Sequence, residues 1–400
     1  RLYTLALLSG AVLCAWLALL ANVTIIGVFA GIVGALTLYF AVRYELCALV
    51  LLTVFTTEFI PRIVALKTLN IYPIALFMPC MLLILITRQA FGTRRYTWPS
   101  FWTIWPMAGL VALGIISNIL ILLTWSPGVE RQENGNPLVY SEILGVLLYI
   151  LPLTFVLVVV ALLTNRERWI RHCVRLFRAL ALLAAAIVLL DFVRLHSSFY
   201  TYRFEEPTIG WISLQGLAMP IGLGCIFSYT YLLHARGWRR RLLSTGEMLL
   251  CLLALCITLQ NSWWIEVVIG IITVTALYSY RLLAVLVLAG IIALLPMQGQ
   301  FAMLQSVKAG DIYRLVVWQD MLRVWALHPV LGVGPGNVWT YDQRFTHLPL
   351  LLRDFNATGL GVAHNGYLQV LVELGPLGVV FLLALLFLLG LACWRLYRRS

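Results

Sequence analysis

Apolar stretches long enough to cross a lipid bilayer recur along the chain from Leu2 to Cys393. A spanning helix needs about 20 predominantly apolar residues. The chain is 62% hydrophobic and only 11% charged, whereas a soluble domain is roughly half apolar. Because the stretches recur, a secretory signal at the N-terminus does not explain them. The sequence therefore predicts an all-α, polytopic membrane protein.

We expect about twelve transmembrane helices, with boundaries uncertain by several residues. The predicted spans are 2–20, 23–42, 46–60, 71–87, 101–124, 143–163, 177–195, 211–233, 247–260, 263–280, 282–296 and 375–394. Spans 46–60, 247–260 and 282–296 are short for a perpendicular helix, so they are extended by flanking residues or partly irregular. Two outer loops of moderate length, 125–142 and 196–210, stand out among short connections.

Most basic residues fall in alternate connections, which the positive-inside rule places in the cytoplasm. Both termini are then cytoplasmic, and segment 297–363 lies on the outer side of the membrane. The expected organisation is a set of transmembrane helices with short loops in 1–296, a long periplasmic loop in 297–363, and a last helix with a cytoplasmic tail in 364–400.

The net charge of +12 does not indicate a nucleic-acid partner. The basic residues separate the spans and form no aromatic-interleaved tract on a soluble domain. None of the eight cysteines lies in the long outer loop. They are therefore expected to pack as small apolar residues rather than to form a disulfide framework.

The long loop contains three recognisable parts. Residues 311–327 predict an amphipathic helix that ends at His328-Pro329. Its apolar side would hold Ile312, Leu315, Val316, Leu322 and Trp325, and its polar side Arg314, Gln319, Asp320 and Arg323. A tight irregular stretch, Leu331 to Asn337, follows. A helix over 365–374 then ends at Gly375-Pro376, since proline cannot continue it.

Four histidines are expected outside, His196, His328, His347 and His364, and histidine suits general-base work near neutral pH. Each is also a candidate for a structural hydrogen bond. Acidic residues at membrane depth, Glu58, Asp191, Glu266 and Glu373, either serve function or join helices. Glu373 points away from His364 on a shared helix, so it is expected to hold neighbouring helices.

Two external arginines suit a diphosphate, which needs fixed positive charge. Arg203 lies in an aromatic-rich loop and either holds a phosphate or anchors the chain at the interface. Arg314 either faces a cavity or is solvated. The stretch Gly332 to Gly336 is not a nucleotide-binding loop, because it follows no strand and Pro335 lacks an amide donor. No metal-binding motif occurs in the sequence.

Three ordered motifs resemble the O-antigen ligase and O-antigen polymerase superfamily of membrane glycosyltransferases. They are Arg314 with Trp318, then His328-Pro329-Val330-Leu331-Gly332-Val333-Gly334-Pro335-Gly336-Asn337, and then His364-Asn365-Gly366-Tyr367-Leu368-Gln369 with Glu373-Leu374-Gly375-Pro376-Leu377-Gly378. Where relatives often carry a Ser-Arg pair between two helices, this chain has Asn261-Ser262. Charge stabilisation then falls to other arginines.

The resemblance implies transfer of a glycan from undecaprenyl diphosphate on the periplasmic side, with inversion and without metal or other cofactor. His364 would deprotonate the acceptor hydroxyl, and Arg314 would stabilise the leaving diphosphate. Arg203, Asn365, Tyr367 and Trp339 are expected to contact the diphosphate or the glycan. The partners expected are the lipid-linked O-antigen donor, the lipid A-core acceptor of lipopolysaccharide biosynthesis, and membrane lipids.

Within this superfamily an O-antigen ligase is the first interpretation, because one outer loop near the C-terminus dominates whereas polymerases often present two. A polysaccharide polymerase and a protein O-oligosaccharyltransferase remain alternatives. A lipid-linked glycan transporter is an alternative of another class, since many helices and intramembrane acids also suit transport.

Overall fold

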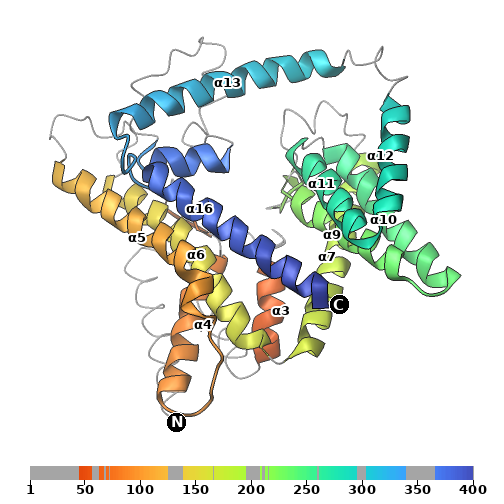
Figure 1. The fold of residues 1–400 in the computed structure, drawn as a ribbon, viewed down its shortest axis with the longest axis horizontal. Coiled ribbons are helices and arrows are strands. Elements are labelled where there is room, and N and C mark those ends of the chain that lie inside the picture. Colours follow the sequence, from red (N-terminus) through yellow and green to blue (C-terminus); the bar gives the residue numbers. More distant parts are fainter. Residues whose placement is uncertain are drawn as a thin grey trace. The chain divides into compact units, whose positions relative to one another are not determined.

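The protein is described by a computed structural model over residues 45–55, 63–66, 69–71, 73–124, 138–164, 166–194, 208–209, 212–214, 216–258, 261–294, 303–338 and 365–399. These residues are predominantly helical (Figure 1). Within them, five helices are long and apolar enough to cross a membrane: Phe101–Ile121, Gly145–Leu163, Arg168–Val193, Trp238–Thr258 and Gly366–Arg395. A helical membrane protein is confirmed, and the number of about twelve spans stays a prediction.

The chain divides into two compact units. Unit one comprises Arg1–Thr97 and Val158–Val285, and unit two comprises Trp98–Leu157 and Leu286–Ser400. The described helices of unit one are α3 (Glu45–Phe55), α4 (Pro73–Ala90), α7 (Glu167–Arg194), α9 (Ala218–His234), α10 (Trp238–Thr258) and α11 (Asn261–Tyr278). Those of unit two are α5 (Phe101–Thr124), α13 (Met303–Leu327) and α16 (Gly366–Arg399). Helices α6 (Leu138–Leu163) and α12 (Tyr280–Leu294) run from one unit into the other.

Several predicted boundaries are wrong. Helix α7 begins at Glu167 rather than 177, and α10 begins at Trp238 rather than 247. Both extensions carry arginines, which end an apolar run but do not end a helix, since arginine is a good helix former. With its extension, α10 has 21 residues, so the predicted span 247–260 belongs to a helix that is long enough to cross a membrane. Helix α6 likewise begins at Leu138, inside the predicted loop 125–142.

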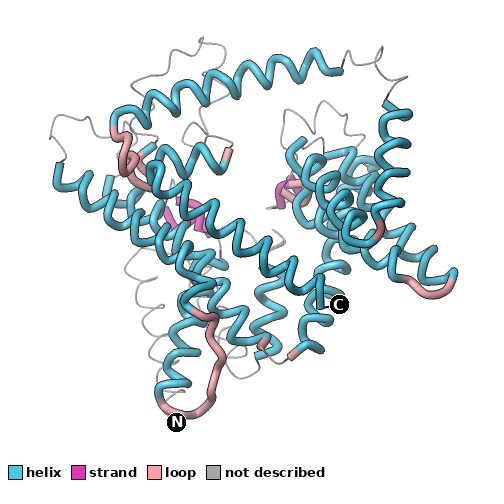
Figure 2. The backbone as a smooth tube through the Cα atoms, in the orientation of Figure 1, coloured by secondary structure: helices cyan, strands magenta, loops and turns pink. Residues whose placement is uncertain are grey.

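Two short antiparallel hairpins were not predicted (Figure 2, magenta). Strand β1 (Ile63–Leu66) pairs with β2 (Leu69–Ile71), and β3 (Thr208–Ile209) pairs with β4 (Ile212–Ser213). The second hairpin reaches into the predicted span 211–233, whose helix α9 begins only at Ala218. Pairs this short leave no periodicity in a sequence, so hydropathy alone does not reveal them.

Small side chains bring the helices of unit one close together. Helix α9 packs against α7, α10 and α11, and its Gly224 lies against Ala181 so closely that an added Cβ would overlap it. Cys225 and Cys251 are buried in the same core, as fillers. Transmembrane helices associate through such small residues, because lipid supplies no hydrophobic driving force between helices.

An ion pair that sequence reasoning missed joins three helices of unit one. The Arg178 guanidinium of α7 donates to Glu247 of α10, and the Ser228 hydroxyl of α9 donates to the same carboxylate at 3.2 Å. The guanidinium also lies over the Tyr231 ring, 3.9 Å from its centroid. Glu247 stood at the edge of a predicted span, so it was not counted among the acids at membrane depth. The pair satisfies two charges that would be costly alone in lipid.

A second carboxylate gathers three arginines at the start of α3. Glu45 is buried and accepts hydrogen bonds from Arg94 at 2.5 Å, from the Tyr96 hydroxyl at 2.8 Å, and from Arg166. The Arg88 guanidinium lies 3.8 Å away. Burial raises the pKa of Glu45, but the hydrogen bonds from Arg166 and Tyr96 outweigh burial, so the pKa lies below its ordinary value.

Acid is expected to destabilise unit one through Glu45, and Glu45→Gln should remove that part of the acid sensitivity. Because the folded pKa of Glu45 is lowered, its ionised form stabilises the fold above the ordinary pKa, and this contribution is lost as pH falls through the folded pKa. At neutral pH the variant should lose less than the about 3–5 kcal/mol of a fully buried pair, since Arg94 is half exposed. Thermal unfolding in detergent at falling pH checks this, and equally steep acid limbs in both proteins would contradict it.

Candidate active site

Helix α13 confirms the helix predicted at 311–327, although it begins earlier, at Met303. Its predicted apolar face is wrong at two positions: Leu315 and Leu322 are 54% and 44% exposed, whereas Val317, Met321 and Val324 are buried. These three pack with Ile121 of α5 and Val372 of α16, and Trp318 and Trp325 pack against the same cluster. The apolar residues cover more than one side of α13, so composition alone did not tell which side would be buried.

The predicted polar side of α13 is also corrected, at Asp320. This residue was predicted to lie on the polar side of α13, and it is only 3% exposed. The Arg323 guanidinium donates to its carboxylate at 2.9 Å, one turn along the helix. Arg314 lies on α13 at 303–327, but its side chain is outside the described residues.

The predicted turn after α13 depends on three glycines, here called the glycine loop and comprising residues 331–337 (Figure 2, pink). Gly332, Gly334 and Gly336 have φ angles of 69°, 81° and 82°. This left-handed region is penalised for residues with a Cβ atom. The expectation that these glycines allow the backbone to turn sharply is therefore confirmed.

The glycine loop caps the first part of α16. The Val333 amide donates to the Val372 carbonyl at 2.8 Å, and the Gly334 amide donates to the Glu373 carbonyl at 3.0 Å. These carbonyls have no partner in their own helix, because α16 is interrupted at Gly375, where φ is 68° and ψ is −171°. The predicted end of the helix at Gly375-Pro376 is thus confirmed, and a second helical segment continues beyond it.

Helices α5 and α6 hold the other side of the glycine loop. The Ser117 hydroxyl of α5 donates to the Leu331 carbonyl at 3.0 Å, and the Asn118 amide donates to the Pro335 carbonyl at 3.3 Å. Asn337 is fully buried, and its Nδ2 donates to Asn118 Oδ1 at 3.4 Å. Gly145 of α6 lies against the Pro335 backbone, where an added Cβ would overlap it. Three helices therefore fix the loop.

Glu373 joins α16 to α6, as expected from its position in the sequence. It is buried, and its carboxylate accepts hydrogen bonds from the Tyr149 hydroxyl and from the Gln369 side-chain amide, both at 2.6 Å. Gln369 lies one turn before Glu373 on the same helix. The bonds tie the first part of α16 to α6 next to the glycine loop.

Asn365 forms the N-cap of α16. Its Oδ1 accepts from the backbone amides of Tyr367 and Leu368 at 3.1 and 3.2 Å, two donors that have no partner within the helix. Tyr367 is 55% exposed at the same end. Asn365 thus stabilises the start of α16. Contact of Asn365 or Tyr367 with substrate stays a prediction.

His364, Arg203 and Trp339, three of the predicted site residues, lie outside the described residues. The structure therefore describes the helix that begins directly after His364 and the glycine loop that packs on that helix. Ser117, Asn118 and Tyr149 were missed by sequence reasoning. The signal for two of them was present, since Ser117-Asn118 is a polar pair inside a long apolar run.

Apolar spanning helices, the glycine loop and a capped helix after His364 define a helical membrane protein with the motifs of the O-antigen ligase and polymerase superfamily. Residues 247–383 match the family model described as O-antigen ligase, so the superfamily resemblance is confirmed. Members of this family are membrane glycosyltransferases. A search of curated proteins finds no match.

Proposed function

We propose that the protein is an O-antigen ligase that moves a glycan from undecaprenyl diphosphate to lipid A-core at the periplasmic face of the inner membrane. The observation that carries the proposal is the family match over 247–383, which includes Arg314 and His364. The firmly held N-terminus of α16 supports it, because a general base needs a fixed position.

In the proposed reaction His364 removes the proton of an acceptor hydroxyl, whose oxygen bonds to the anomeric carbon of the donor sugar. The bond from that carbon to the diphosphate breaks, and undecaprenyl diphosphate leaves with the electron pair. A single displacement inverts the anomeric configuration. Arg314 and Arg203 stabilise the charge that develops on the diphosphate. Asn365, Tyr367 and Trp339, which lie in or next to the two motifs, contact the substrate. No step in this scheme calls for a metal ion.

The decisive experiment gives the purified protein a lipid-linked glycan together with either lipid A-core or more of the lipid-linked glycan. Transfer to lipid A-core is the expected result. Elongation of the lipid-linked glycan without such transfer would replace the ligase by a polymerase. Transfer to a protein hydroxyl would instead identify an oligosaccharyltransferase.

Arg314→Ala is expected to weaken donor binding and to slow transfer together, because the guanidinium is proposed to contact the diphosphate both before and during its departure. Loss of one charge-stabilising group of this kind costs about 100-fold to 1,000-fold in rate. Arg323→Ala is the matched control, since this arginine lies on the same helix and pairs with Asp320. Unchanged donor affinity in Arg314→Ala, with transfer intact, would remove Arg314 from the site.

A further inference from the structure

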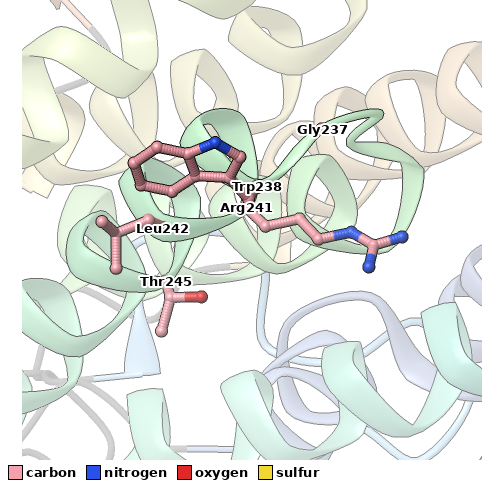
Figure 3. Close-up of a pocket in the computed structure, with 5 residues that line it drawn as sticks. All are labelled: Gly237, Trp238, Arg241, Leu242 and Thr245. Atoms are coloured by element: carbon pink, nitrogen blue, oxygen red, sulfur yellow. The ribbon is translucent and has the colours of Figure 1, made fainter.

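A shallow pocket at the start of α10 combines the chemistry of a phospholipid site (Figure 3). Its volume is about 530 Å³, and it is lined by Gly237, Trp238, Arg241, Leu242 and Thr245. The last four recur at helical spacing along one side of α10. The lining thus places a guanidinium and a hydroxyl beside an indole and an alkyl chain, and both polar groups can donate to phosphate oxygens.

Arg241 is oriented for such a ligand by the end of the preceding helix. Its Nε donates to the Ala235 carbonyl at 3.2 Å, which leaves the two terminal nitrogens of the guanidinium to extend from the helix (Figure 3). Arg239 lies beside the Trp238 ring, 5.6 Å from its centroid, and Arg240 follows. The surroundings of the pocket are therefore strongly positive, which complements an anionic headgroup.

The apolar side of the pocket continues along the membrane-spanning part of α10. Leu242, Leu249 and Leu253 are 63%, 50% and 57% exposed, with two helical turns between the first two and one turn between the last two. Gly246 lies between the first two, and a Cβ built there would meet no atom within 4 Å. This strip of exposed leucines with a gap at Gly246 offers a path for an acyl chain directly below the headgroup pocket.

We propose that this pocket binds one anionic phospholipid, with its phosphate on Arg241 and Thr245 and an acyl chain along Leu242, Gly246, Leu249 and Leu253. The exposed Trp238 ring lies at the headgroup level, where tryptophan is favoured in membranes. Basic pockets at the ends of membrane helices recognise anionic headgroups through this combination of charge and shape. None of the residues that line the pocket is among those proposed for glycan transfer.

The test uses the full chain in detergent and measures lipid binding by native mass spectrometry. Phosphatidylglycerol is expected to bind more tightly than phosphatidylcholine of the same acyl length, and Arg241→Gln is expected to reduce its affinity about fivefold. Thr245→Val should reduce it less, in the same direction. Arg240→Gln is the matched control, because it removes the same charge from a neighbouring exposed position that does not line the pocket.

Two further arms separate the sources of the phosphate. Inorganic phosphate and dihexanoyl phosphatidylglycerol are offered as competitors of the long-chain lipid. Weak competition by inorganic phosphate and intermediate competition by the short-chain lipid are expected if the leucine strip holds an acyl chain. Equal losses of phosphatidylglycerol affinity in Arg240→Gln and Arg241→Gln would show that the lipid does not bind in this pocket. Full displacement of the lipid by inorganic phosphate would show that the site binds a phosphate group and no acyl chain.

Discussion

Replacing His364 by alanine is expected to slow glycan transfer by about 100-fold to 10,000-fold, the usual contribution of a general base. Donor affinity should change little, since His364 is proposed to act on the acceptor hydroxyl rather than on the diphosphate. The measurements are the transfer rate with saturating donor and acceptor and, separately, the affinity for the lipid-linked glycan.

The control for this variant is His347→Ala, a histidine of the same predicted outer loop that the proposed reaction does not use. Preserved transfer in His364→Ala would end the base assignment. Lipid translocation by the unmodified protein, without any glycan transfer, would go further and favour a transporter over an enzyme.

Gly334→Ala is expected to unfold the region around the glycine loop. A non-glycine residue at φ 81° costs about 1–2 kcal/mol by itself. At this position a Cβ would also overlap Asn118 Oδ1 and lie 3.0 Å from Asn337 Nδ2, so both buried amides would have to move. We therefore expect a total loss of more than about 3 kcal/mol, because a buried hydrogen bond would be broken as well.

Gly92→Ala provides the control that separates strain from crowding. Gly92 also has a left-handed backbone, with φ 66°, but no atom lies within 4 Å of a Cβ built there. The Gly92→Ala variant should therefore lose only the backbone contribution, about 1–2 kcal/mol of its free energy of unfolding. Thermal midpoints in detergent would compare the two variants. Equal shifts would show that crowding against α5 at Gly334 does not add to the loss of stability.

Apolar runs were enough to predict the helical class and most helix positions. Helix α5, predicted at 101–124, has those bounds. The runs failed where arginines begin a helix, as at Trp238 to Arg241, because hydropathy describes preference for lipid whereas a helix is built from backbone hydrogen bonds. They also failed at the paired strands β1 and β2, which are too short to leave a periodic pattern.

The glycine loop was predictable as a turn but not as a helix cap. Three glycines separated by single residues indicate a sharply turning backbone. The partners of the loop amides are the carbonyls of Val372 and Glu373, far along the chain, and no local pattern identifies such a pairing. The same holds for Asn118 and Tyr149, whose hydrogen bonds exist only once α5, α6 and α16 are assembled.

The break at Gly375 separates two parts of α16 that have different neighbours. The part before it is fastened by Val333, Gly334 and Tyr149. The part after it presents exposed apolar side chains such as Leu383 and Phe387, as a lipid-facing helix does. Because the helix is interrupted at Gly375, the glycine loop and α6 set the direction of the first part, whereas packing within the membrane sets the direction of the second.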